Sequence, residues 1–265
     1  MFLGDTHTHS LCSPDGHNTV LEMARAASAA ELTHLCLTDH WDLVTLQGEP
    51  NYTYDWTPYN AAVAEARAAL PQGLTLAQGM ELGEVYENPG AARAVLAAQP
   101  HLDFVIGSVH NMSPDTGGLD FYFVEYNSRA DCDAALDNYF DSMDKLSRTD
   151  FYDVLGHIIY PLRYMHGLGS MDPYYDRIYQ LLATAARMGR GIEVNTYRGK
   201  TVAEWRPVLE RWQEVGGELV TVGSDAHRPE HVGLGVLEAY ELLKDVGFRY
   251  VTVYEKRKPK LIPIG

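Results

Sequence analysis

The sequence has few basic residues, few cysteines and no long apolar run. Lys and Arg number 21 against 36 Asp and Glu, which gives a formal net charge of -15. Long nucleic acids and anionic membranes bind basic surfaces, so we expect neither as a partner. No stretch approaches the roughly 18 apolar residues of a membrane helix, and residues 1–4 do not resemble the start of a signal peptide. We therefore expect a cytoplasmic protein.

The chain also lacks paired cysteines and linkers. Cys12, Cys36 and Cys132 are odd in number and form no CxxC pair, so we expect free thiols. No Ser/Gly/Pro-rich segment or charge block divides the 265 residues. This length suits one barrel of about 250 residues, and we predict a single domain over residues 1–265. Nothing in the sequence indicates the oligomeric state.

Strand-like and helix-like segments alternate along the whole chain, which is typical of βα units around a parallel sheet. The helix-like segments have apolar residues near a 3.6-residue period and lie near 19–30, 60–70, 90–99, 132–146, 176–189, 202–215 and 231–247. The predicted strands are 2–7, 34–40, 74–81, 104–110, 154–157, 191–195, 219–224 and 249–254. Seven helices and eight strands predict a barrel. Two long irregular segments, 41–58 and 111–130, would lie over its active face.

Residues that bind metals gather where the predicted strands end. The motifs are "DTHTH", "CLTDH", "GMELGE", "GSVH", "LGH" and "GSDAH", in chain order. Catalytic residues of a βα barrel lie at this end of the strands. His7 and His9 alternate along a strand and therefore point the same way, so both rings can reach one ion. One such pair is a weak signal, but its repetition at successive strand ends indicates a metal centre.

The number of candidate ligands exceeds what one ion can hold, so we predict two or three divalent ions. Glu81 is the natural carboxylate bridge, because no lysine that could be carbamylated occurs before Lys145. Such a cluster produces hydroxide near neutral pH and binds phosphoryl oxygens. Arg163 and Arg198 follow two of the strands and could bind the outer oxygens of a phosphate, although either could equally be a surface residue. The candidate ligands are His7, His9, Asp15, His40, Glu81, His110, His157, Asp225 and His227.

The motifs, in this order and over nearly the whole chain, resemble the polymerase-and-histidinol-phosphatase (PHP) family of metal-dependent phosphoesterases. The resemblance implies a distorted (β/α)7 TIM-like barrel with zinc, iron or manganese at the C-terminal ends of its strands. Three ions are implied. The first would be held by His7, His9, Glu81 and Asp225, the second by Glu81, His110 and His157, and the third by Asp15, His40 and His227.

Segments such as "GHIIYPLRY" and "EVNTYRGK" are most similar to the histidinol-phosphatase branch of the family, in which Arg163 and Arg198 would bind the substrate phosphate. His17 is a further candidate for substrate contact, with an ordinary loop histidine as the alternative. The other histidines, His34, His101, His166 and His231, are given no chemical role. Asn195 either touches the site or makes a structural hydrogen bond.

The resulting hypothesis is an enzyme of histidine biosynthesis that hydrolyses L-histidinol phosphate to L-histidinol and phosphate by attack of a metal-bridging hydroxide. Glu81 would bridge the ions between which the hydroxide lies. Asp225, His227 or a metal-bound water would protonate the leaving alcohol. The acidic chain suits a substrate with a cationic amine and imidazole, which Asp or Glu of the two long loops could bind. One alternative is a phosphoesterase for nucleotides or other small phosphate esters. The other is a metal-binding module without catalysis, although such copies of the domain lose ligands.

Overall fold

Seven parallel strands form the centre of the molecule in the computed structural model, which describes residues 2–265. Their neighbour order is β1-β2-β4-β5-β6-β7-β8, so the chain moves round the sheet in one direction. Each predicted strand from residue 2 to 224 is present, with ends shifted by a few residues. The strands are β1 (Gly4–Thr8), β2 (His34–Leu37), β4 (Thr75–Gly83), β5 (Phe104–Ser108), β6 (Val154–Leu155), β7 (Gly191–Asn195) and β8 (Val220–Gly223).

The sheet closes on itself between the first and last of these strands. The backbone N–H of Asp225 donates to the carbonyl of His7 at 2.9 Å, and that of His9 donates to Ala226 at 2.8 Å. Gly223 permits the approach, because a Cβ there would lie only 2.3 Å from the Cβ of His7. The predicted distorted (β/α)7 barrel is therefore confirmed, and its seam places Asp225 beside His7 and His9.

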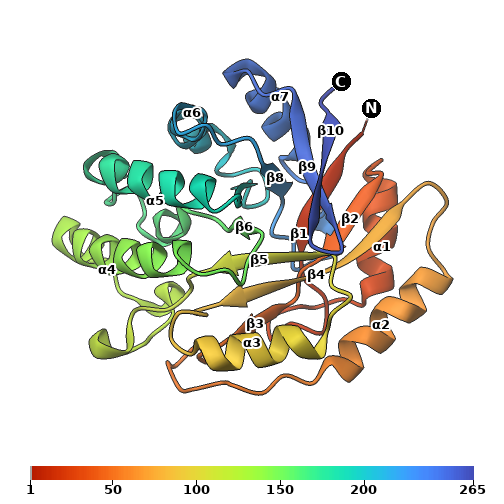
Figure 1. The fold of residues 1–265 in the computed structure, drawn as a ribbon, viewed down its shortest axis with the longest axis horizontal. Coiled ribbons are helices and arrows are strands. Elements are labelled where there is room, and N and C mark those ends of the chain that lie inside the picture. Colours follow the sequence, from red (N-terminus) through yellow and green to blue (C-terminus); the bar gives the residue numbers. More distant parts are fainter. Residues whose placement is uncertain (1) are drawn as a thin grey trace.

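Seven helices form a ring around the strands (Figure 1). Helix α1 shows why these segments are helical: Thr19 and Glu22 form a capping box at its start, and Val20, Met23, Ala24 and Ala27 form its buried face. Along residues 2–265, no helix has the length and apolar composition needed to cross a membrane. The helices are α1 (Val20–Ala29), α2 (Trp56–Ala68), α3 (Pro89–Ala98), α4 (Arg129–Ser147), α5 (Tyr175–Arg187), α6 (Arg206–Glu214) and α7 (Val236–Val246).

The second predicted strand, 34–40, is interrupted. After β2 the chain turns at Asp39, whose buried carboxylate accepts hydrogen bonds from the backbone of Ser10 at 2.6 Å and the hydroxyl of Ser13 at 2.7 Å. A separate short strand, β3 (His40–Asp42), then pairs with β4 and sets His40 directly opposite Glu81. The break therefore aligns two candidate ligands side by side.

The eighth predicted strand does not belong to the barrel. Residues Tyr250–Glu255 form β9, which pairs antiparallel with β10 (Lys258–Pro263) in a separate hairpin. Tyr254 of β9 stacks on Phe104, with ring centroids 4.9 Å apart, among apolar residues at the N-terminal ends of the strands. A period-two pattern predicts a strand but not its partner, since any half-buried strand shows it. The hairpin covers the end of the barrel opposite the strand-end motifs.

The two long segments predicted to be irregular contain short elements. Residues 41–58 include the end of β3 and the start of α2, and residues 111–130 include two 3-10 helices, η1 (Pro114–Thr116) and η2 (Phe121–Phe123). The segments meet, because the side-chain amide of Asn111 donates to the carbonyl of Thr45 at 2.9 Å and the backbone of Asp120 donates to Leu46. They form one wall of the cavity described next.

Candidate metal centre

A cavity of about 430 Å³ opens at the C-terminal ends of the strands, where the sequence motifs lie. Asp15, His40, Glu81, His110 and His157 line it, together with Asp225 and His227. His7 and His9 are fully buried at its floor, within reach of Glu81. The fold thus brings all nine candidate ligands, from six separate strand ends and a loop, to one place.

Four of these side chains surround a single point at the floor. Nε2 of His7 lies 3.0 Å from Oε2 of Glu81 and 3.7 Å from Oδ1 of Asp225. Nε2 of His9 lies 3.5 Å and 3.4 Å from the same two oxygens. Ligands 2.0–2.1 Å from a tetrahedral zinc ion stand about 3.3 Å from one another. The spacing of this quartet suits one metal ion.

The other oxygen of Glu81 belongs to a second group. Oε1 lies 3.1 Å from Nε2 of His110 and 2.7 Å from Nε2 of His157, and the two nitrogens are 3.1 Å apart. Two imidazole nitrogens and a carboxylate oxygen at these distances are suited to bind one metal cation between them. Glu81 therefore directs one oxygen to each group, as a bridging ligand does.

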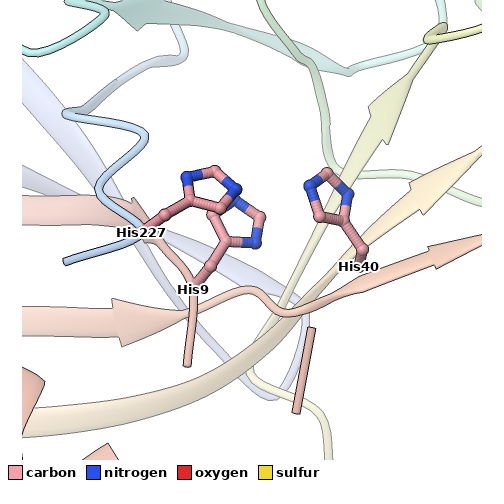
Figure 2. Close-up of side chains that lie close together, drawn as sticks. All are labelled: His9, His40 and His227. Carbon is pink, nitrogen blue, oxygen red and sulfur yellow. The ribbon is translucent and has the colours of Figure 1, made fainter. Parts of the chain in front are cut away.

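The third group lies nearer to the cavity mouth. Figure 2 shows the rings of His9, His40 and His227, which come from separate segments; the ring of His9 stacks on each of the other two, with centroids 4.3 and 4.0 Å away. Asp15 is the outermost member, with one oxygen 3.0 Å from Nε2 of His227 and the other 4.0 Å from Nε2 of His40. Its side chain is 58% exposed, so it is the least constrained of the candidate ligands.

The pKa shifts in the cluster keep its two central carboxylates ionised. Burial by itself raises the pKa of Glu81, but His7, His40 and His110 outweigh burial and hold it well below its usual range. Burial also raises the pKa of Asp225, but the positive charges of Arg163 and His7 outweigh burial and hold this pKa well below its usual range. The pKa of His9 is lowered, mainly by burial and then by His227 and His40, and its Nε2 has no hydrogen-bond partner. Ionised carboxylates beside a neutral imidazole with a free nitrogen fit a bound metal ion.

A second layer of residues holds the histidines in place, and the sequence analysis missed it. Glu193, fully buried on β7, contacts Nδ1 of His7 at 2.6 Å and accepts from the backbone of His157 at 2.9 Å. Oδ2 of Asp42 lies 3.2 Å from Nδ1 of His110. Such partners fix the orientation of metal-binding rings. A usable signal existed for Glu193, which precedes Asn195 by two residues and so shares its face of the strand.

The two predicted arginines both line the cavity. The side chain of Arg163 is 5% exposed and donates to Asp225 at 2.7 Å and to Oδ1 of Asn195 at 2.6 Å. Arg163 thus supports a candidate ligand, a contact that its position in the sequence did not indicate. Arg198 follows β7 in the left-handed region with φ 59°, and its backbone donates to Ser224. Asn195 reaches the site, because its amide also lies 3.3 Å from Asp225.

The remaining histidines differ in their placement. His17 is exposed and lines the cavity, as its suggested role requires. His231, to which the sequence analysis gave no role, also lines the cavity, and so does the neighbouring Arg228. His34 lies at the start of β2, at the far end of the barrel, where burial lowers its pKa to about 4.

Comparison with known proteins identifies the family of the chain. The model of the PHP domain family matches residues 5–197. The chain belongs to this family. A protein of Deinococcus radiodurans named probable histidinol-phosphatase is 29% identical over 265 residues, covering 96% of this chain and 98% of that protein. The histidinol-phosphatase of Lactococcus lactis is 23% identical over 269 residues, covering 96% of this chain and 95% of that protein.

A solved structure shows the same fold. The histidinol phosphate phosphatase of L. lactis, determined in complex with zinc, L-histidinol and phosphate, superposes with a TM-score of 0.83 at 21% identity. The match covers 97% of this chain and 98% of that one. The likeness therefore extends through β8 and α7, which lie beyond the residues matched by the family model.

Proposed function

We propose that this protein is a metal-dependent phosphomonoesterase that hydrolyses L-histidinol phosphate to L-histidinol and phosphate. The observation that carries the proposal is the geometry of Glu81, whose two oxygens face separate groups of histidines at the floor of a cavity lined by arginines. The names of the relatives point to the same reaction. The bound state of the L. lactis enzyme supports zinc as one suitable metal, with iron and manganese as alternatives.

Three groups of side chains would hold the ions. We assign His7, His9, Glu81 and Asp225 to the first ion, and Glu81, His110 and His157 to the second. Asp15, His40 and His227 would hold a third, to which His9 also lies close. Divalent ions in such a cluster supply a nucleophile from water near neutral pH and neutralise phosphate oxygens.

The chain's own residues would bind and orient the phosphate. Arg163 and Arg198 present guanidinium groups to the cavity, and the buried contacts of Arg163 with Asp225 and Asn195 fix its orientation. His17, in the loop after β1, also lines the cavity and would be a further contact for the substrate. Preorganised positive charge of this kind stabilises the charge that develops on the transferred phosphoryl group.

The leaving alcohol needs a proton, and Asp225 is poorly placed to supply it. Its Oδ2 accepts from Arg163 and its Oδ1 faces His7 and His9, so neither oxygen is free for the substrate. His227 lines the cavity and remains a candidate donor, with water as the other source. We also propose that residues 1–265 form a single domain, since β8 and α7 complete the barrel begun by β1.

Steady-state kinetics on purified, metal-loaded protein test the proposal. We expect a higher kcat/KM for L-histidinol phosphate than for glycerol phosphate or a 3',5'-bisphosphonucleotide. Preference for the bisphosphonucleotide would favour the nucleotide alternative, and metal-replete protein that hydrolyses none of them would favour the non-catalytic module. Elemental analysis of the same preparation gives the number of ions bound per chain.

A further inference from the structure

Charge is unevenly distributed around the cavity. Arg163, Arg198 and Arg228 line it from the segments after β6, β7 and β8. The acidic lining residues outside the predicted ligand set are Asp42 on β3 and Asp120 in the loop after β5. In the strand order β5 adjoins β6 and is two strands from β7 and three from β8, so the loop of Asp120 is farther round the barrel from Arg198 and Arg228 than from Arg163. The cavity therefore has an acidic side that the binding of a phosphate does not require.

Asp120 differs from the other acids of the cavity because it has no partner of opposite charge. The residue is 5% exposed, and Oδ1 accepts one hydrogen bond, from the backbone of Tyr122 at 2.7 Å. Ion pairs formed within residues 2–265 do not include Asp120, whereas Asp42 approaches Nδ1 of His110 at 3.2 Å. A buried carboxylate without a cation is costly unless a ligand supplies the charge.

The surroundings of Asp120 suit a cationic nitrogen on a planar ring or beside one. Tyr122 and Phe123 follow it in η2, line the cavity and are 63% and 46% exposed. The ring of Tyr122 meets that of Tyr164 edge-on, with centroids 5.5 Å apart, which extends the aromatic wall toward Arg163. Aromatic faces attract cations, and a carboxylate beside them strengthens the binding.

We propose that Asp120 determines specificity by binding a cationic nitrogen of the alcohol part of the substrate, so that the cavity selects phosphate monoesters of positively charged alcohols. This inference rests on the proposed function, since L-histidinol phosphate is such an ester. It assigns the two ends of the substrate to the two sides of the cavity, with the phosphate near the arginines and the cation near Asp120.

The variant Asp120→Asn removes the charge with little structural change, because the amide oxygen can still accept from the backbone of Tyr122. We expect kcat/KM for L-histidinol phosphate to fall about 10- to 100-fold, mainly through KM, while kcat/KM for glycerol phosphate changes less than about threefold. Asp120→Glu keeps the charge and should retain more of the preference than Asp120→Asn. Asp115→Asn is the matched control, since Asp115 is an exposed acid of the same loop and does not line the cavity.

Calorimetric binding of L-histidinol provides a readout that does not depend on turnover. Its affinity should fall in Asp120→Asn by the same factor as kcat/KM and stay unchanged in Asp115→Asn. Unchanged affinity and preference in Asp120→Asn would overturn the role of Asp120 alone. Equal losses for both esters would also overturn it, because they indicate general damage. A wild-type protein without preference for the cationic ester would overturn the proposed substrate and this inference together.

Discussion

The two ends of the barrel differ in how their polar groups are satisfied. At the C-terminal end, imidazoles and carboxylates crowd around Glu81, and buried atoms such as Nε2 of His9 lack hydrogen bonds. At the N-terminal end, the hairpin β9–β10 covers the strands, Tyr254 stacks on Phe104, and the carboxylate of Asp153 is held by Arg257 and the backbone of Val105. Imidazole nitrogens without hydrogen bonds are concentrated at the C-terminal end, which marks it as a site built for a ligand, whereas the apolar contacts under the hairpin contribute stability. Substitutions at the two ends should therefore have different consequences.

The largest expected effect comes from Glu81→Gln at the C-terminal end. Loss of the charge removes a ligand from two predicted sites at once, so we expect kcat/KM to fall at least about 1,000-fold and the bound metal to drop below the wild-type amount. Glu65→Gln on the exposed face of α2 is the control. Near-normal turnover with full metal content would remove Glu81 from the centre of the mechanism.

At the N-terminal end, Tyr254→Ala should affect stability instead. The side chain is 6% exposed and packs among Cys36, Phe104, Ile106 and Val154, so its removal leaves a cavity that costs about 3 kcal/mol in the free energy of unfolding. Chemical denaturation measures this loss. We expect the activity of the folded fraction to stay close to that of the wild type. Tyr254→Phe keeps the ring and is the matched control; a loss of activity without a loss of stability would contradict the division between the two ends.

Glu193→Gln lies beneath the site and should have an intermediate effect. The carboxylate accepts from the backbone of His157 and contacts Nδ1 of His7, and an amide would turn a donor toward one of these groups. We expect metal affinity to fall about 10- to 100-fold, measured by competition with a chelator. Glu218→Gln, at an exposed position before β8, should bind metal normally. Unaltered affinity in Glu193→Gln would mean that His7 does not depend on this partner.

How much could be predicted from the sequence depends on the range of the contact. The seven barrel strands and the motifs at their ends could be read locally, because alternation and helical periodicity are properties of short segments. The family assignment is confirmed, while the roles of individual ligands stay predictions. The hairpin was misplaced because the pattern of 249–254 carries no information about its partner. Glu193 and Asp120 were not singled out, since their importance comes from His7, 186 residues from Glu193, and from the cavity wall.

The smallest expected effect comes from Arg257→Gln in the turn of the hairpin. Burial raises the pKa of Asp153, and Arg257 limits the rise, so loss of the guanidinium should raise this pKa further. A protonated Asp153 has no charge for Arg257 to stabilise, so the substitution costs no stability near and below the usual carboxyl pKa. The loss of stability grows as the pH rises through the pKa that Asp153 has in the folded protein. We expect a loss of about 1–2 kcal/mol at pH 7 that shrinks toward pH 4, because Arg257 is partly exposed and Arg190 lies 3.9 Å from Asp153. Chemical denaturation at pH 7 and pH 4, with Lys258→Gln as the control, measures this loss in the free energy of unfolding. An equal loss of stability at the two pH values would show that Arg257 acts through the conformation of the turn and not through its charge.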